Sequence, residues 1–320
     1  MRDAFVRALL REMEKDPRIV LITGDLGFGV LRPVKEKYPD RLINAGIAEQ
    51  SMLGLAAGLS MTGRKVVVYS IGNFPTLRPL EQIRNDCAYH DAEVKIVCVG
   101  GGFVYGSLGM SHHATEDMAV MRAIPGITCF TPGDPAETEA VVPVLFATRG
   151  TCYLRLGRGN EPRAHEGELP AWEFPRAIRL REGRDIAILS AGGILTEAKR
   201  AAELLEQEGI GAEVLSFPCL KPLDRETVLE TAARFPDILT VEEHSITGGF
   251  GSAVCEVMAE AGSGCRVHRI GLQDCFATVV GNQAYLRRIY GMDAEAIAEK
   301  AAALVRNGRK DGAVRDGERR

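Results

Sequence analysis

The sequence predicts an α/β protein with two open αβα domains, each built on a largely parallel sheet. Short β-branched runs alternate with amphipathic segments along nearly all of the 320 residues, a pattern typical of parallel strands joined by helices. The alternation stops once, in a stretch rich in proline and charge, and then resumes, which indicates two domains. We therefore place domains at 1–160 and 185–307, a linker at 161–184 and a disordered tail at 308–320.

In the first domain, runs rich in β-branched residues mark strands, and segments that mix polar and apolar residues mark helices. The first 16 residues form an amphipathic helix with both signs of charge, which is unlike a secretory signal. Strands are predicted at 18–23, 65–71, 94–99, 127–130 and 151–156. An extended segment at 41–44 leads into a helix that holds Glu49 in its first turn, and further helices are predicted at 77–89, 116–123 and 135–147.

The second domain repeats the alternation. Its predicted strands are 185–190, 213–217, 238–242 and 266–270, and its predicted helices are 195–208, 225–234, 251–261 and 294–305. The last helix is expected to dock as a C-terminal element, and the charged tail that follows it is expected to fray.

The composition argues against several kinds of partner. A formal net charge of −4 gives no electrostatic reason to expect nucleic acid or an anionic membrane. No apolar run is long enough to span a bilayer. The eight cysteines contain no C-x-x-C pair and lie mostly in strand-like runs, which predicts buried, reduced thiols in a cytoplasmic protein and no metal site.

One carboxylate stands out because of the helix that it begins. Glu49 precedes residues 51–61 (SMLGLAAGLSM), which contain no ionisable side chain. A carboxylate that enters such an apolar helix loses part of its hydration, and this favours sharing a proton with a partner group. Glu49 is therefore the first candidate for catalysis.

Further polar groups are predicted at the carboxyl ends of strands, where open α/β sheets bind ligands. Asp25 follows the first strand, although aspartate is also common in turns. His112 and His113 share a loop, and they suit hydrogen bonding to a substrate better than metal binding, because adjacent side chains diverge. Arg158 ends the first domain, where it binds a substrate carboxylate or phosphate or, alternatively, forms a domain-linker ion pair.

The segment 248–251 (GGFG) joins a strand to a helix. Its glycines suit either a cradle for an anion or close helix–sheet packing, and we favour the packing interpretation. The sequence contains no G-x-G-x-x-G that opens a strand–helix unit, no G-x-x-x-x-G-K-[ST] and no G-x-S-x-G. The usual nucleotide-binding and acyl-transfer interpretations therefore lose their main support.

Taken together, these segments resemble the C-terminal half of transketolase and its thiamine-diphosphate-dependent relatives. Segment 44–50 (NAGIAEQ) is similar to the motif around the family's catalytic glutamate. Segments 111–117 (SHHATED) and 121–125 (MRAIP) resemble the family's T-H-x-x-x-E-D and L-R-x-I-P segments. Segments 241–244 (VEEH) and 248–252 (GGFGS) are similar to the signature of its C-terminal domain. Three motifs in the family's order, with matching spacing, make the resemblance strong.

The resemblance implies a thiamine-diphosphate pyrimidine-binding domain at 1–160 and a transketolase C-terminal domain at 185–307. In the family, the glutamate hydrogen-bonds N1′ of the cofactor's aminopyrimidine and thereby activates C2 of the thiazolium. By this resemblance Glu49 is catalytic and also binds the cofactor. Phe74 is expected to stack on the pyrimidine, and Asp25 is expected beside the thiazolium.

The resemblance also implies substrate contacts. His112 matches a histidine that faces the donor sugar's hydroxyls, and we assign it to catalysis and, with His113, to substrate binding. Arg158 matches an arginine that holds the substrate's phosphate. Three further polar contacts of the family fall instead on Gly29, Gly100 and Leu108. Since losing a matched polar contact changes discrimination strongly, the substrate is expected to differ from the usual pentose phosphate, or the contacts to come from elsewhere.

An enzyme of this type also needs a domain that binds the diphosphate through Mg²⁺, and no matching G-D-G segment is found here. The resemblance thus implies a split enzyme. Thiamine diphosphate would be shared with an N-terminal transketolase-type partner subunit that holds Mg²⁺, in an α2β2 heterotetramer. The expected reaction moves a two-carbon ketol unit from a ketose or ketose phosphate to an aldose.

Three alternatives stay open from the sequence. The first is the β subunit of a 2-oxo acid dehydrogenase E1 component, although segment 121–125 looks more like transketolase and deoxyxylulose-phosphate synthase. The second is an enzyme similar to that synthase. The third is a non-catalytic subunit that has kept the fold.

Overall fold

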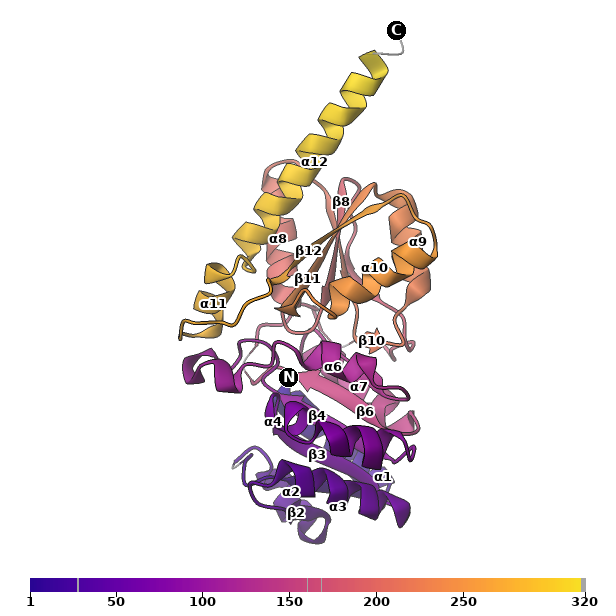
Figure 1. The fold of residues 1–320 in the computed structure, drawn as a ribbon, viewed down its shortest axis with the longest axis vertical. Helices are drawn as coiled ribbons and strands as arrows, with labels where there is room; N and C mark the ends of the chain where they lie inside the picture. The colour runs from indigo at the N-terminus through magenta and orange to yellow at the C-terminus, as the bar shows by residue number, and fades with distance from the viewer. Residues whose placement is uncertain (28, 160, 168, 318–320) are drawn as a thin grey trace.

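The computed structural model shows two α/β domains stacked along the long axis of the molecule, which confirms the predicted fold class (Figure 1). It describes residues 1–27, 29–159, 161–167 and 169–317, with side chains as far as residue 308. The N-terminus lies near the junction of the domains, and α12 (Ala294–Gly317) projects beyond the second domain. The predicted domain limit at 160 and the tail residues 318–320 lie outside the described residues.

The first domain is built on a seven-stranded sheet with the order β10-β5-β6-β4-β3-β1-β2. The strands pair in parallel, except that β10 is antiparallel to β5. Their bounds are β1 (Ile19–Thr23), β2 (Leu42–Asn44), β3 (Lys65–Ile71), β4 (Val94–Val99), β5 (Thr128–Phe130), β6 (Cys152–Leu156) and β10 (Cys219–Lys221).

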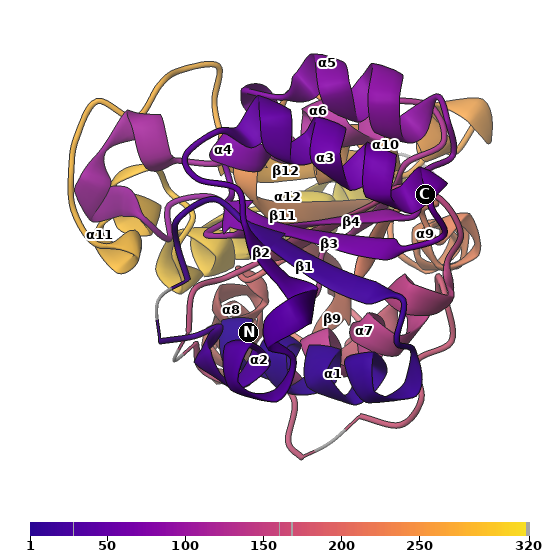
Figure 2. The ribbon, with the colours of Figure 1, turned by 90° about the horizontal axis from the view of Figure 1, so that it is seen from below.

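Helices cover both faces of this sheet (Figure 2). In β3, Val66 and Val68 pack on one face, whereas Val67 and Tyr69 pack on the other, because successive side chains of a strand alternate. One face carries α1 (Arg2–Lys15), α2 (Arg32–Lys37) and α7 (Pro135–Ala147). The other carries α3 (Glu49–Met61), α4 (Phe74–Leu77), α5 (Leu80–Gln82), the π-helix η2 (Ile83–Ala88) and α6 (Asp117–Ala123).

The direction of winding reverses between β1 and β3. From β1 the chain moves to β2 on one side, and it then returns to β3 on the other side. In open α/β sheets such a reversal leaves a crevice at the carboxyl ends of the two strands. Asp25 follows β1 and Phe74 follows β3, so the fold brings both to this edge.

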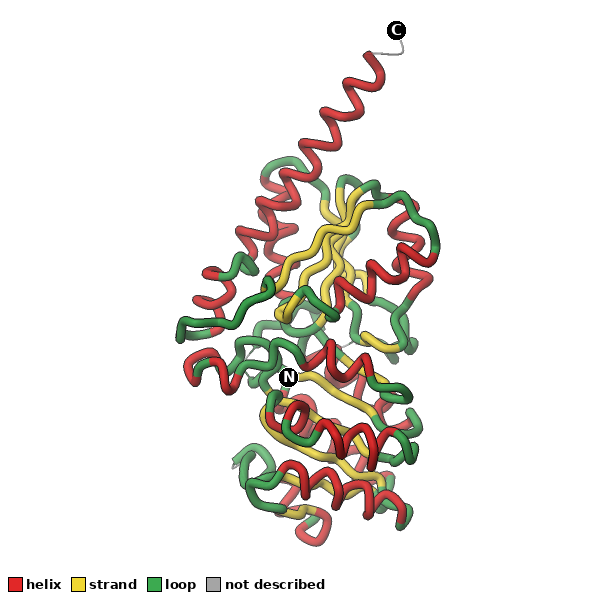
Figure 3. Tube along the Cα trace, viewed as in Figure 1, coloured by secondary structure: helices red, strands yellow, loops and turns green. Residues whose placement is uncertain are grey.

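The second domain has a five-stranded sheet with the order β12-β11-β8-β9-β7 (Figure 3). Its strands are β7 (Ile178–Arg181), β8 (Ile186–Ala191), β9 (Ala212–Ser216), β11 (Asp237–Ser245) and β12 (Arg266–Leu272). One face packs on α8 (Leu195–Gln207) and α12, and the other on α9 (Arg225–Arg234) and α10 (Phe250–Glu260). The shorter helical pieces are α11 (Gln283–Ile289), η1 (Pro39–Arg41), η3 (Gly106–Leu108) and η4 (Met110–His112).

The structure differs from the sequence prediction mainly between and beyond the regular segments. Part of the predicted linker forms β7, which pairs antiparallel with β9, and β10 pairs with β5 of the first domain. The helix predicted at 77–89 is divided into α4, α5 and η2, because Pro79 interrupts it. The helix α12 continues to Gly317, through most of the tail that the sequence analysis expected to be disordered.

A buried ion pair joins the two domains. Arg155 of β6 donates from Nε to Asp117 Oδ2 at 2.7 Å, and from Nη2 to the carbonyls of Ala114 and Glu243 at 2.9 and 3.0 Å. The Arg155 and Asp117 side chains are 4% and 1% exposed. Because a guanidinium carries its donors in one rigid plane, this side chain fixes the loop at 114, the start of α6 and the end of β11 relative to one another.

The segment after β6 is tied to the start of α7. The backbone N–H groups of Ala164 and His165 donate to Asp134 Oδ2 at 2.9 and 3.0 Å, and His165 Nε2 lies 2.7 Å from Glu137 Oε1. Burial opposes protonation of His165, but the hydrogen bond and the charge of Glu137 more than compensate. The pKa of His165 is therefore raised above its ordinary value of 6.5.

This raised pKa makes the stabilisation by His165 depend on pH. The folded state holds the proton more tightly than the unfolded state, so the contribution is complete below pH 6.5 and is lost as the pH rises through the folded-state pKa. We expect His165→Gln to lower the urea midpoint more at about pH 6 than at about pH 9. The exposed His90 provides a control in His90→Gln, and equal losses for His165→Gln at both pH values would contradict this assignment.

Candidate active site

The candidate site surrounds Glu49 at the carboxyl edge of the first sheet. Glu49 is the first residue of α3, and its side chain is 4% exposed. The rest of α3 is uncharged, and its residues Met52, Leu53 and Ala56 are buried in the core beneath it. The carboxylate is thus held at the N-terminus of an apolar helix, where the helix dipole favours its negative charge.

Arg78 connects Glu49 with Phe74. Its Nη1 donates to Glu49 Oε2 at 3.0 Å, and its guanidinium carbon lies 4.0 Å from the centroid of the Phe74 ring. A planar group that donates hydrogen bonds is therefore held against both a carboxylate and an aromatic face. The Arg78 side chain is 49% exposed, so this position is accessible from solvent.

The loop after β1 is fixed against the segment that leads to Glu49. Asp25 N donates to Asn44 Oδ1 at 2.9 Å, and Asn44 Nδ2 donates back to Asp25 Oδ1 at 3.2 Å. Asp25 has a φ of 55°, in the left-handed region, which costs a residue of this type on the order of 1 kcal/mol. The paired hydrogen bonds offset that cost and hold Asp25 beside the start of the Glu49 segment.

The two histidines expected to bind substrate point in different directions. The ring of His112 packs edge-on against Phe74, with centroids 5.1 Å apart, whereas His113 is 3% exposed and packs against Phe103 at 5.2 Å. Burial lowers the pKa of His113. The backbone becomes extended at His113, just after η4, which turns the adjacent side chains apart. The structure therefore groups His112 with Phe74 but does not bring His113 to the same edge.

The glycines after β4 make room for side chains from elsewhere. A Cβ at Gly100 would lie 2.2 Å from the ring of Tyr105, and Gly100 has a φ of 95°, which disfavours any side chain there. A Cβ at Gly101 would lie 2.7 Å from Cζ of Arg155. This part of the sequence is glycine because other side chains occupy the space above it.

Arg158 lies over Tyr105, with its guanidinium carbon 5.4 Å from the ring centroid. It is exposed and lines a cavity of about 360 Å³ between the domains. The alternative of a domain-linker ion pair is not formed with any acidic side chain among the described residues. Burial raises the pKa of Tyr105, and the charges of Arg158 and Arg2 act in the opposite direction. The phenol is therefore protonated at neutral pH.

Sequence reasoning missed three polar residues of this edge. They are Asn44, Arg78 and Tyr105. The sequence gives Arg78 only one signal, its position four residues after Phe74 in a segment that follows a strand. Tyr105 has none, because its ring reaches Gly100 through the path of an irregular loop.

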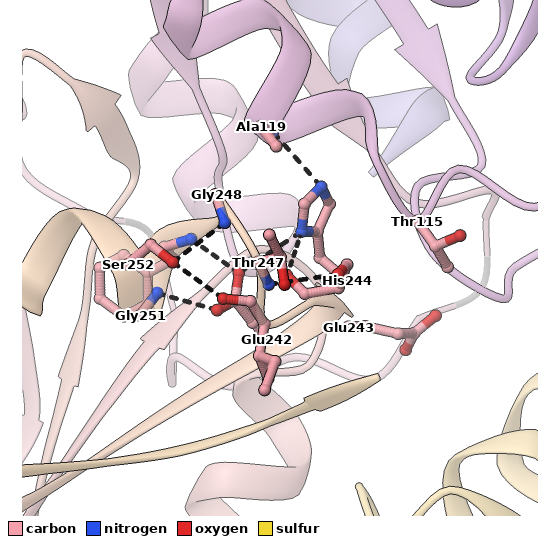
Figure 4. Close-up of polar contacts among 12 residues, drawn as sticks. Thr115, Ala119, Glu242, Glu243, His244, Thr247, Gly248, Gly251 and Ser252 are labelled. Atoms are coloured by element: carbon pink, nitrogen blue, oxygen red, sulfur yellow. Dashed lines mark hydrogen bonds and ion pairs between the residues drawn. The ribbon is translucent and has the colours of Figure 1, made fainter. Parts of the chain in front are cut away.

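The C-terminal signature forms an internally bonded cluster (Figure 4). Glu242 of β11 directs its carboxylate to the N-terminus of α10, where it accepts hydrogen bonds from Phe250 N at 2.6 Å and Gly251 N at 2.8 Å. Glu242 thus occupies the place where an anion would bind. A Cβ at Gly249 would lie 2.1 Å from Glu242 Oε2, so the glycine permits close packing. The packing interpretation favoured from the sequence fits this geometry.

The same cluster faces the first domain. His244 is fully buried, its Nδ1 donates to Ser245 O at 2.7 Å, and its Nε2 accepts from Ala119 N of α6 at 3.4 Å (Figure 4). Burial lowers the pKa of His244, which matches a neutral ring with one donor and one acceptor. Burial also raises the pKa of Glu242 to about 7. These groups are committed to the domain junction.

Neither a metal centre nor a membrane span is present in the described part of the chain. No group of three or more His, Cys, Asp or Glu side chains there is placed to hold a metal ion. Within the same residues, every helix is too short or too polar to cross a membrane.

A buried carboxylate at the start of an apolar helix, beside an aromatic ring at the winding reversal of a parallel sheet, defines a domain of the thiamine-diphosphate-dependent class. Residues 1–163 match the family model of the transketolase pyrimidine binding domain, and residues 176–297 match that of the transketolase C-terminal domain. The chain belongs to the transketolase family.

Relatives match along almost their whole length. One of the two kinds of chain of the apulose-4-phosphate transketolase of Phocaeicola vulgatus is 36% identical over 306 residues, which are 95% of this chain and 97% of that protein. A 6-deoxy-6-sulfo-D-fructose transketolase subunit of a Clostridium species is 37% identical over 304 residues, 94% of this chain and 93% of that protein. A solved structure described as a split gene transketolase, inactive β4 tetramer, superposes with a TM-score of 0.87 at 35% identity, covering 95% of this chain and 97% of that one.

The Glu242 cluster gives a stability prediction. Gly249→Ala would place a methyl group 2.1 Å from Glu242 Oε2 and 2.6 Å from His244 Nδ1, so it should destabilise the protein by about 1–3 kcal/mol. Gly264→Ala is a matched control, because no atom lies within 4 Å of its Cβ position. Urea unfolding of both variants measures the difference, and a Gly249→Ala variant as stable as the control would refute the close packing.

Proposed function

We propose that this chain is the C-terminal component of a split transketolase, which transfers a two-carbon ketol unit from a ketose or ketose phosphate to an aldose. The observation that carries the proposal is the pairing of a buried Glu49 carboxylate with the Phe74 ring at the sheet edge. His112 lies beside Phe74, on the side from which a donor sugar would approach.

The residues present fit the aminopyrimidine of thiamine diphosphate. The guanidinium of Arg78 is a flat group with N–H donors, and Glu49 and Phe74 already hold it through a hydrogen bond and a ring face. A protonated pyrimidine nitrogen offers the same combination of planarity and donor. When bound, the cofactor supplies a nucleophilic carbon that adds to the donor's carbonyl. Glu49 would hold and share the proton on the ring nitrogen, and Phe74 would orient the ring.

The other residues would act on the substrate. His112 is placed to donate or accept hydrogen bonds with donor hydroxyls, and Arg158 is exposed and free to hold an anionic end. Asp25, held by Asn44, is the candidate neighbour of the thiazolium. His113 is buried against Phe103 and takes no part in this arrangement.

The proposal includes a partner subunit. The family to which the chain belongs uses thiamine diphosphate, and two relatives that match along their whole length are named as transketolase subunits. We propose that an N-terminal transketolase-type subunit supplies Mg²⁺ and the diphosphate site, in an α2β2 assembly. The similar split-gene structure, described as an inactive β4 tetramer, supports the view that subunits of this type need a partner for activity.

The central experiment replaces the proposed proton-sharing group. In the complex with its partner, Glu49→Gln keeps the shape of the side chain but removes its capacity to share a proton, so ketol transfer should fall by at least about 100-fold. The exposed Glu36 offers a matched control, and Glu36→Gln should retain full activity.

The rate of ketol transfer from a ketose phosphate to an aldehyde measures both variants. Full activity of Glu49→Gln would reject the proposed role. Condensation of pyruvate with glyceraldehyde 3-phosphate by the wild-type complex would instead identify the deoxyxylulose-phosphate-synthase-like alternative.

A further inference from the structure

The site lacks a polar side chain at Gly100, where the strand β4 meets the sheet edge. The left-handed φ of 95° and the Tyr105 ring, 2.2 Å from the Cβ position, together prevent any side chain from projecting there. The place is nevertheless filled, since Tyr105 reaches it from a loop five residues further along the chain. Tyr105 is therefore the group that this protein presents where residue 100 would otherwise reach out.

Tyr105 lies among positive charges. The guanidinium of Arg158 lies over its ring at 5.4 Å, and Arg2 is close enough to influence its phenol electrostatically. Arg2 also packs beside Arg158, because its Nη2 would lie 3.4 Å from a Cβ at Gly159. Two cations and a neutral hydroxyl donor thus converge on one region, the combination that recognises tetrahedral oxyanions.

Tyr105 is also connected with the cofactor end of the edge. Tyr69 of β3 lies against the loop after β1, where a Cβ at Gly27 would be 3.4 Å from its ring, and its phenol senses the charges of both Arg2 and Tyr105. The sheet edge therefore continues from the Asp25 loop through Tyr69 to Tyr105. A bound donor can extend along this path, with its reacting carbons near Glu49 and its far end near Arg158.

We propose that Tyr105 is a specificity-determining residue, whose hydroxyl donates a hydrogen bond to a terminal phosphate or sulfonate group of the donor ketose held by Arg158 and Arg2. The inference rests on the proposed function and adds to it the residue that replaces the missing side chain at Gly100. The hydroxyl contributes to ground-state binding of the distant anion, so it should affect KM more than kcat.

Three donors that differ only at C6 test this inference in the complex with the partner subunit. They are D-fructose 6-phosphate, 6-deoxy-6-sulfo-D-fructose and D-fructose, with glycolaldehyde as the acceptor. Tyr105→Phe keeps the ring over Gly100 and removes only the hydroxyl. We expect it to raise KM about tenfold for the charged donors that the wild type uses, with kcat and the KM for D-fructose unchanged.

The controls separate a specific role from a structural one. Tyr89 is 84% exposed, so Tyr89→Phe should leave all three KM values unchanged, and the affinity of thiamine diphosphate should be the same in both variants and the wild type. A response with only one charged donor shows which oxyanion the hydroxyl contacts, and it supports the inference.

Three outcomes would overturn the inference. They are an unchanged KM for both charged donors in Tyr105→Phe, an equal change for all three donors, and a wild-type complex that shows no preference for a charged donor. A wild-type complex that transfers no ketol unit from any donor would reject the proposed function itself, and this inference with it.

Discussion

The arrangement of the site depends on one buried contact, the ion pair of Arg155 with Asp117. The same guanidinium binds the carbonyls of Ala114 and Glu243, so it fixes the loop that carries His112 against both domains. Removing one partner of such a pair leaves an uncompensated buried charge, which costs roughly 3–5 kcal/mol. The contact therefore defines the path of the chain from Gly100 to α6, and with it the positions of Tyr105 and His112.

The motifs that suggest chemistry divide into two groups. The segment around Glu49 and the loop at His112 present side chains to the accessible edge of the sheet. The VEEH and GGFG segments turn inward, where Glu242 binds the start of α10 and His244 meets α6. A strand, a glycine turn and a helix look like an anion site in sequence, but here a carboxylate of the same domain occupies the helix N-terminus.

Much of the fold could be predicted because its strands are buried on both faces and read as continuous apolar runs, as in β1 and β4. The short edge strands β7 and β10 could not, since three or four residues that pair antiparallel at an edge carry no such pattern. In the site, Glu49 was recognisable from its uncharged helix. Tyr105 and Arg78 were not, because their contacts depend on loop paths, and the separation of His112 from His113 depends on one extended residue.

The central claim is that Glu49 binds the cofactor's pyrimidine at the interface with a second subunit. The most direct measurement is a structure of the complex with its partner and thiamine diphosphate. The account predicts that a Glu49 carboxylate oxygen lies within hydrogen-bond distance, about 2.6–3.0 Å, of the pyrimidine nitrogen N1′, with Phe74 against the ring. A Glu49 side chain turned to bulk solvent, with the pyrimidine bound elsewhere, would contradict it.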